Sequence, residues 1–159
     1  MRSLNAFFVI LFSFCQATQA SDEPILGYWA AAGSIIQIKI CERFICAEIV
    51  HLITEEGVDP LSILDENNSE RELQNRTLIG VNLFDGFQQE FLSNEKIQGG
   101  RIYDPRRGKF YKSELTLLET GNLLVEGCLL FLCDGEEWLP LEVTLNPDGS
   151  RQATLKNSQ

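Results

Sequence analysis

The chain has 159 residues, with 13 Lys and Arg against 23 Asp and Glu, and therefore a net charge of −10. Hydrophobic residues make up 44% and charged residues 23%, which is typical of a folded domain and too apolar for a disordered one. The acid excess argues against nucleic acid or an anionic membrane surface as the main partner, because both attract basic proteins. The single histidine, His51, excludes a site built on two imidazoles.

Residues 1–20 have the pattern of a secretory signal peptide. Arg2 supplies a positive charge, residues 7–15 form an apolar run, and small side chains at Thr18 and Ala20 suit a signal peptidase. A transmembrane anchor would need about 20 apolar residues, which is more than this run provides. The pattern predicts cleavage after Ala20, export of the chain, and one domain over residues 21–159.

Four cysteines follow Ala20, in two pairs with the same spacing: Cys41 with Cys46, and Cys128 with Cys133. In an oxidising compartment an even number of cysteines favours disulfides over free thiols. Each pair lies between two β-like runs, so we expect local Cys41–Cys46 and Cys128–Cys133 bridges, each of which clamps a hairpin. Cross-pairing and a four-thiolate zinc site are the alternatives. The favoured interpretation includes no metal and no cofactor.

The remainder of the chain has the pattern of β-strands separated by turns. Apolar and polar residues alternate over residues 36–40, which predicts a strand with one buried face formed by Ile36, Ile38 and Ile40. Further strands are expected at residues 27–29, 45–53, 77–84, 99–103, 109–118, 123–128, 137–145 and 151–156. A polar connection over residues 55–75 should hold one helical turn near residues 70–74. About eight short strands at regular spacing predict an antiparallel barrel or sandwich.

Several of these segments together resemble a known family. The motifs are Gly27-Tyr28-Trp29, Gly99-Gly100-Arg101-Ile102-Tyr103-Asp104-Pro105, and Gly127-Cys128 followed by Cys133 and Trp138. In this order they resemble the domain-of-unknown-function family 2147, which consists of small exported bacterial proteins. The resemblance spans nearly all of the chain after residue 20. It implies an all-β, antiparallel, lipocalin-like or fatty-acid-binding-like barrel of about eight strands, a periplasmic location, and no established activity.

The candidate site residues follow from the expected barrel. Trp29 lies in a Gly-x-Trp motif of the first strand, as in lipocalins, and is expected to be a structural plug at the closed end. Ile38 and Leu115 are expected to line an apolar wall. Tyr103 and Tyr111 are the expected polar contacts to a ligand, because a phenol combines apolar area with one hydrogen-bonding group.

The predicted function is the binding of a small apolar or amphipathic ligand, because small barrels hold such molecules in their interior. No nucleophile motif accompanies His51, and adjacent carboxylates such as Glu136 and Glu137 face opposite sides of a strand, so an enzyme is not expected. We expect neither a nucleic acid partner nor stable membrane insertion after signal removal. The alternative is a structural or protein-interaction role in the cell envelope, with a filled interior. A hollow of about 300 Å³ or more would favour the ligand.

Overall fold

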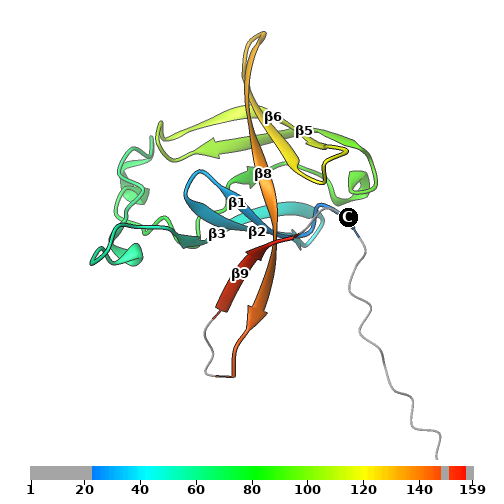
Figure 1. The fold of residues 1–159 in the computed structure, drawn as a ribbon. Helices are drawn as coiled ribbons and strands as arrows, with labels where there is room; N and C mark the ends of the chain where they lie inside the picture. The colour runs from blue at the N-terminus through cyan, green and yellow to red at the C-terminus, as the bar shows by residue number, and fades with distance from the viewer. Residues whose placement is uncertain (1–22, 148–150, 157–159) are drawn as a thin grey trace, which may run out of the picture.

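A computed structural model describes residues 23–147 and 151–156, which form an eight-stranded antiparallel barrel with a ninth strand beside it (Figure 1). The strands are β1 (Gly27–Ala31), β2 (Ser34–Cys41), β3 (Phe44–Leu52), β4 (Phe84–Asp85), β5 (Lys96–Asp104), β6 (Lys109–Leu117), β7 (Leu123–Leu129), β8 (Leu132–Leu145) and β9 (Arg151–Leu155). Three short 3-10 helices accompany them: η1 (Pro60–Ser62), η2 (Arg71–Leu73) and η3 (Gln89–Phe91). The predicted signal peptide over residues 1–20 lies outside the described residues.

The barrel runs up and down, because strands that follow one another in the chain lie side by side. Their order is β3-β2-β1-β8-β7-β6-β5-β4, with β9 on β8. Backbone bonds then join β3 to the segment around β4, as Ile49 N donates to the carbonyl of Val81 at 3.0 Å and Leu83 N to that of Ala47 at 2.6 Å. These bonds almost close the sheet on itself and protect its outer strands. The all-β barrel expected from the sequence is confirmed.

The observed strands differ most from the expected ones in two places. Residues 77–83 are mostly irregular, and only Phe84–Asp85 form β4. In contrast, β8 begins at Leu132, five residues before the expected start at residue 137. Its first part pairs with β7 although it is polar there, so hydrophobic alternation gave no signal for it. On β2 the sequence predicted a buried face of Ile36, Ile38 and Ile40. Ile40 is 44% exposed, so the buried face ends at Ile38.

One end of the barrel is packed solidly. Buried side chains from four strands fill it: Ile38, Ile97, Leu115 and Leu123. Trp29 is buried nearby, and its Nε1 donates to the carbonyl of Ile25 at 2.9 Å, which ties the segment before β1 to the barrel. The role of Trp29 as a structural plug stays a prediction. We call this packed end of the barrel the closed end.

Candidate functional site

The other end of the barrel is hollow. A cavity of about 720 Å³ lies there, between the β1–β2 turn, the β5–β6 turn and the β7–β8 hairpin. Its volume lies within the range of small-molecule sites. The large apolar lining residues inside the barrel come from β2, β3, the segment before β4, β5, β7 and β8: Ile36, Ile49, Leu52, Leu78, Leu83, Ile102, Val125 and Trp138. Strand alternation therefore directs apolar side chains from most of the barrel into one space.

The hollow has a physical cause in the sizes of the side chains. Ala31, Ser34 and Gly127 lie on the wall near the opening, and each leaves room that a larger residue would fill. Deeper in the barrel, Trp138 stacks on Phe84 with ring centroids 5.6 Å apart and an interplanar angle of 11°. Because large rings occupy the middle of the barrel and these three small residues leave space near its mouth, the cavity has a floor and an opening.

The four residues expected to contact a ligand separate into two groups. Tyr103 and Tyr111 line the cavity. Ile38 and Leu115 are both 1% exposed and belong to the packed core, so they are not part of the cavity lining. Ile36 and Val125 line the cavity wall, where the sequence predicted Ile38 and Leu115. Contact of Tyr103 or Tyr111 with a ligand stays a prediction.

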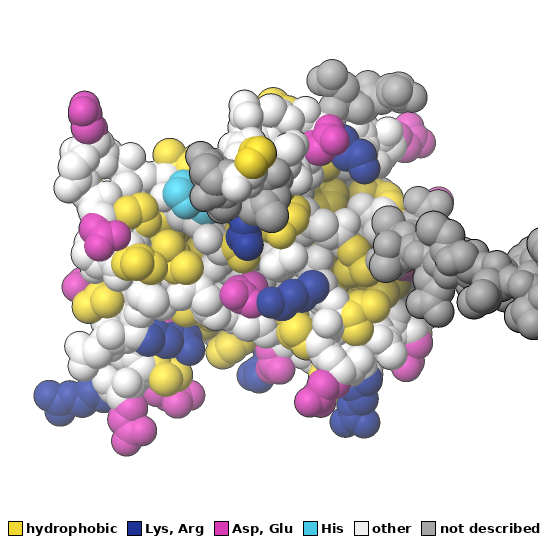
Figure 2. Space-filling model, turned by 90° about the horizontal axis from the view of Figure 1, so that it is seen from below, with side chains coloured by type: hydrophobic (Ala, Val, Ile, Leu, Met, Phe, Trp, Pro, Cys, Tyr) yellow, Lys and Arg dark blue, Asp and Glu magenta, His cyan; other side chains and the backbone are white. Residues whose placement is uncertain are grey.

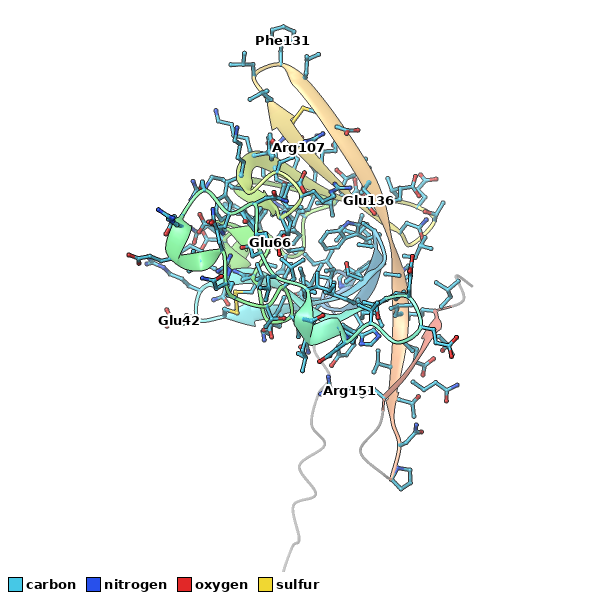
Figure 3. All side chains as sticks on the ribbon, turned by 90° about the vertical axis from the view of Figure 1, so that its left-hand side faces the viewer. Glu42, Glu66, Arg107, Phe131, Glu136 and Arg151 are labelled. Atoms are coloured by element: carbon cyan, nitrogen blue, oxygen red, sulfur yellow. A yellow bond between two sulfur atoms is a disulfide. The ribbon has the colours of Figure 1, made fainter. Side chains whose placement is uncertain are left out.

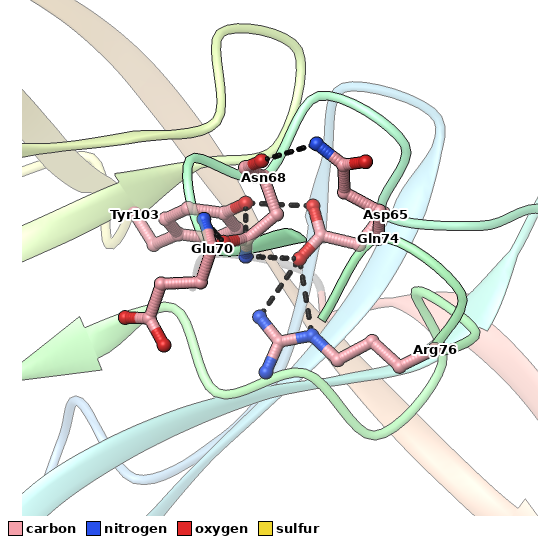
Figure 4. A network of polar contacts seen from close by, with 6 residues as sticks. All are labelled: Asp65, Asn68, Glu70, Gln74, Arg76 and Tyr103. Atoms are coloured by element: carbon pink, nitrogen blue, oxygen red, sulfur yellow. Dashed lines mark hydrogen bonds and ion pairs between the residues drawn. The ribbon is translucent and has the colours of Figure 1, made fainter. Parts of the chain in front are cut away.

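The hydroxyl of Tyr103 belongs to a buried polar network (Figure 4). It donates to Asp65 Oδ1 at 2.6 Å and accepts a hydrogen bond from Asn68 Nδ2 at 2.8 Å. Asn68 Nδ2 also donates to Asp65 Oδ2 at 2.7 Å, and Gln74 donates to the carbonyl of Asn68 at 2.9 Å. The network therefore fastens the long connection between β3 and β4 to the cavity wall at β5.

Arg76 balances the charge of this network. Its Nε and Nη2 donate to Asp65 Oδ2 at 3.0 and 2.8 Å, so the buried carboxylate has a cationic partner. A buried charge without such a partner would be costly. Burial, followed by the hydrogen bond to Asp65, raises the pKa of Tyr103 to about 12. The phenol is therefore neutral at any physiological pH. Because Tyr103 pairs with Phe110, next to the inward pair of Ile102 and Tyr111, its side chain lies on the outer face of β5, beneath the connection.

Tyr111 offers a different polar group to the cavity. Among residues 23–147 and 151–156, its hydroxyl makes no hydrogen bond, and the side chain is half-buried. Ser113 lies two residues further along β6, on the same face, and is buried with no partner for Oγ within the described chain. Of the two tyrosines predicted from the sequence, Tyr111 is the one whose hydroxyl can bind a ligand without breaking an internal contact.

Charges of both signs surround the opening. Arg106 and Arg107 on the β5–β6 turn bind the Asp104 carboxylate, at 3.1 and 3.4 Å. The Asp104 carboxylate raises the pKa of Arg106, with smaller contributions from Glu136 and Asp134 on β8. Figure 3 shows Arg107 and Glu136 on the same side of the barrel as the β7–β8 hairpin. A polar head group at the opening would therefore find donors and acceptors.

Other features of the molecule offer less to a ligand. A second hollow of about 300 Å³ lies outside the barrel, lined among others by Ile35, His51 and Val143. Figure 2 shows the molecule from below, where hydrophobic side chains alternate with scattered charged ones. The described residues hold no group of three or more His, Cys, Asp or Glu side chains that would suit a metal ion. The cavity inside the barrel is therefore the candidate site.

Comparison with known families agrees with this architecture. The model of the family DUF2147, described as an uncharacterized protein conserved in bacteria, matches residues 27–139. The chain belongs to the DUF2147 family. The matched region runs from the start of β1 into β8 and so contains the whole cavity wall. The family resemblance predicted from the sequence motifs is confirmed.

A solved structure shares the fold of this DUF2147 member. Protein HP1028 from Helicobacter pylori, described as belonging to the lipocalin family, has a TM-score of 0.59 and 17% sequence identity, over 72% of this chain and 80% of the other. At that identity the likeness shows the lipocalin-like fold alone. No curated protein matches the chain. In the described part of the chain, no helix has the length and apolar character needed to cross a membrane.

Proposed function

We propose that the protein binds a small apolar or amphipathic molecule in the barrel cavity, without catalysing a reaction. The observation that carries this proposal is the cavity of about 720 Å³ with its apolar wall. It exceeds the roughly 300 Å³ at which small-molecule sites begin. The alternative is a structural or protein-interaction role in the cell envelope, for which we expected a filled interior. A cavity of this size favours ligand binding over that alternative.

The lining also suggests how such a ligand would lie. An apolar chain would contact Ile36, Ile49 and Trp138 in the depth of the cavity. A polar end would point to the opening, where Tyr111 and the charged rim of the β5–β6 turn lie. The lipocalin-like fold supports this orientation, because small barrels of that kind take ligands through one open end.

The proposal can be tested with two adjacent alanines of β1. Ala31 lines the cavity, whereas Ala30 faces the other side of the strand. Ala31→Trp should fill the opening and lower the affinity for a fluorescent fatty acid at least tenfold, while Ala30→Trp adds the same ring outside and leaves binding unchanged. Cooperative thermal unfolding of both variants checks the fold. If the wild-type protein takes up no such probe, or if Ala31→Trp binds it equally well, the proposal is wrong.

We also propose a periplasmic address, which rests on the signal pattern of residues 1–20 and on the two cysteine pairs at disulfide distance. The protein recovered from a Gram-negative periplasm should begin at Ser21. Measurement of its intact mass tests this, and a mass that includes Met1 would contradict it. Native mass spectrometry of the same sample would detect a retained ligand.

A further inference from the structure

The turn between β7 and β8 carries an unusual surface. Leu129 and Leu132 end the two strands and pair with each other, and the turn itself consists of Leu130 and Phe131. Leu130 is 88% exposed and Phe131 is 85% exposed, while the two flanking leucines are about two-thirds exposed, at 65% and 68%. Figure 3 shows Phe131 at the tip of a hairpin that projects from the barrel. We call residues 129–132 the apolar tip.

Folding does not explain the residues of this tip. Leu130 has a φ of 58°, a left-handed conformation that favours Gly, Asn or Asp and is disfavoured for leucine. A two-residue hairpin turn with a positive φ at its first residue alone usually has Gly there. Leucine and phenylalanine at these positions also gain no burial in the described structure. Their apolar side chains are therefore unfavourable for the isolated protein and suit an apolar environment outside it.

A second hairpin of the same chain provides an internal comparison. The β2–β3 hairpin also has a two-residue turn within a cysteine pair, Cys41 with Cys46, and Glu42 has a φ of 57°. Its turn residues are Glu42 and Arg43, both charged and exposed. Because β2 begins with cavity-lining Ser34 and runs away from the opening, this charged turn lies at the closed end. Of these two turns, the apolar one lies at the cavity end.

The geometry points to a lipid surface as the occupant: we propose that the apolar tip inserts reversibly into the apolar layer of a membrane, as a peripheral contact of residues 129–132 and not as the stable insertion that the sequence argues against. Consecutive residues of a β-ribbon face opposite sides, so residues 129–132 present apolar groups on both faces. A flat protein surface would cover one face only, whereas hydrocarbon surrounds both. Leu129 and Leu132 also line the cavity, so the inserted tip would bring the cavity opening to the lipid surface.

The charge of the protein indicates which lipids it would meet. A net charge of −10 opposes binding to an anionic surface, so zwitterionic lipids should be preferred. Attraction through apolar side chains should also persist at high salt, because screening weakens only charge interactions. This inference does not depend on ligand binding in the cavity. Vesicle binding by the apolar tip can therefore be measured with protein that carries no ligand.

A tryptophan placed at the tip would report insertion. The natural Trp29 and Trp138 are 2% and 3% exposed, so they should respond little to lipid. With vesicles of phosphatidylcholine and phosphatidylethanolamine, Phe131→Trp should show a blue-shifted emission and quenching by brominated acyl chains. Arg43→Trp, at the matching turn of the closed end, should show neither. Absence of both signals in Phe131→Trp, or equal signals in the two variants, would overturn the proposal.

A loss-of-function variant separates insertion from folding. Leu130→Gly with Phe131→Asn places glycine at the turn position that has a positive φ, so the protein should be at least as stable as the wild type. It should nevertheless bind these vesicles at least tenfold more weakly, because two apolar side chains are lost. Leu155→Ser removes an exposed leucine of β9 and should leave vesicle binding unchanged. Unchanged binding in the double variant, or a tip-dependent dimer in a wild type that does not bind vesicles, would refute membrane insertion.

Discussion

The hydroxyl of Tyr103 donates to Asp65 across 38 positions of the sequence, at an O–O distance of 2.6 Å. Tyr103 lies on β5 and lines the cavity, whereas Asp65 lies in the long connection between β3 and β4. This bond therefore couples the cavity wall to the least regular part of the described chain. Because Asp65 is also bound by Asn68 and Arg76, the contact belongs to a network whose members depend on one another.

Removal of this hydroxyl should destabilise the protein. In Tyr103→Phe, Asp65 loses one hydrogen bond but keeps those from Asn68 and Arg76. We expect a decrease of about 2 kcal/mol in the free energy of unfolding, since hydrogen bonds to charged groups contribute about that much. Urea denaturation followed by fluorescence measures it. Tyr111→Phe is the matched control and should change stability by no more than about 0.5 kcal/mol.

The same hydroxyl should make stability depend on alkaline pH. The pKa of Tyr103 is raised from 10.0 to about 12 in the folded protein. Unfolded chains therefore lose this proton first, and the contribution of Tyr103 is complete below pH 10 and is lost as the pH rises from 10 to 12. Denaturation at several pH values should show a decline in the wild type that is smaller in Tyr103→Phe. Parallel curves for the two proteins would contradict this assignment.

The sequence was informative where side chains follow a local rule. Alternation predicted β2, runs separated by turns predicted β3, β6 and β7 to within a few residues, and equal spacing predicted which cysteines lie close together. The irregular stretch before β4 follows no such rule. There Asn82 Oδ1 accepts a hydrogen bond from Ala47 N at 2.8 Å and helps to hold the segment against β3. A side chain that replaces a strand contact leaves no periodic pattern.

The cavity was predictable only in part for a similar reason. Alternation shows which side chains face inward, but it does not show how far along the barrel the interior is filled. Here Trp138 lines the cavity and stacks on Phe84 behind it, and the two rings come from strands more than 50 residues apart in the chain. Ile38 and Leu115 therefore face inward as expected but lie in the packed core.

Gly108 should tolerate no side chain. A Cβ at this position would stand 1.6 Å from the carbonyl oxygen of Asn67, and the backbone has a φ of 63°. Gly108→Ala should therefore displace the connection next to Asn68 and destabilise the protein by more than the roughly 1 kcal/mol of backbone strain alone. Gly121→Ala is the control, because its φ is 82° and nothing lies within 4 Å of the new Cβ. Equal losses of stability in the two variants would show that the connection can move away at no cost.

The two cysteine pairs should form local disulfides. Cys41 lies 5.9 Å from Cys46 and Cys128 lies 4.0 Å from Cys133, measured between Cα atoms. Peptide mapping without reduction should find each pair linked, and a peptide that joins Cys41 to Cys128 would contradict this pairing. In the chain-entropy estimate each short loop contributes about 2 kcal/mol. Cys128→Ser with Cys133→Ser should therefore lower stability by about that amount.

Tyr111 should contribute affinity through its hydroxyl, provided that the cavity binds an amphipathic ligand. This hydroxyl makes no hydrogen bond within the described residues, so Tyr111→Phe should leave the free energy of unfolding nearly unchanged. A hydrogen bond to the polar end of a ligand contributes about 1 kcal/mol, which predicts a roughly fivefold weaker affinity for a fluorescent fatty acid.

A purely apolar probe that lacks the head group distinguishes this contact from a change in cavity shape. Its affinity should be equal in the wild type and in Tyr111→Phe, because the ring that lines the wall is retained. Titrations with both probes at the same pH measure the difference. Equal affinities of the two proteins for the fatty acid would place its polar end elsewhere, against the charged rim of Arg106 and Arg107.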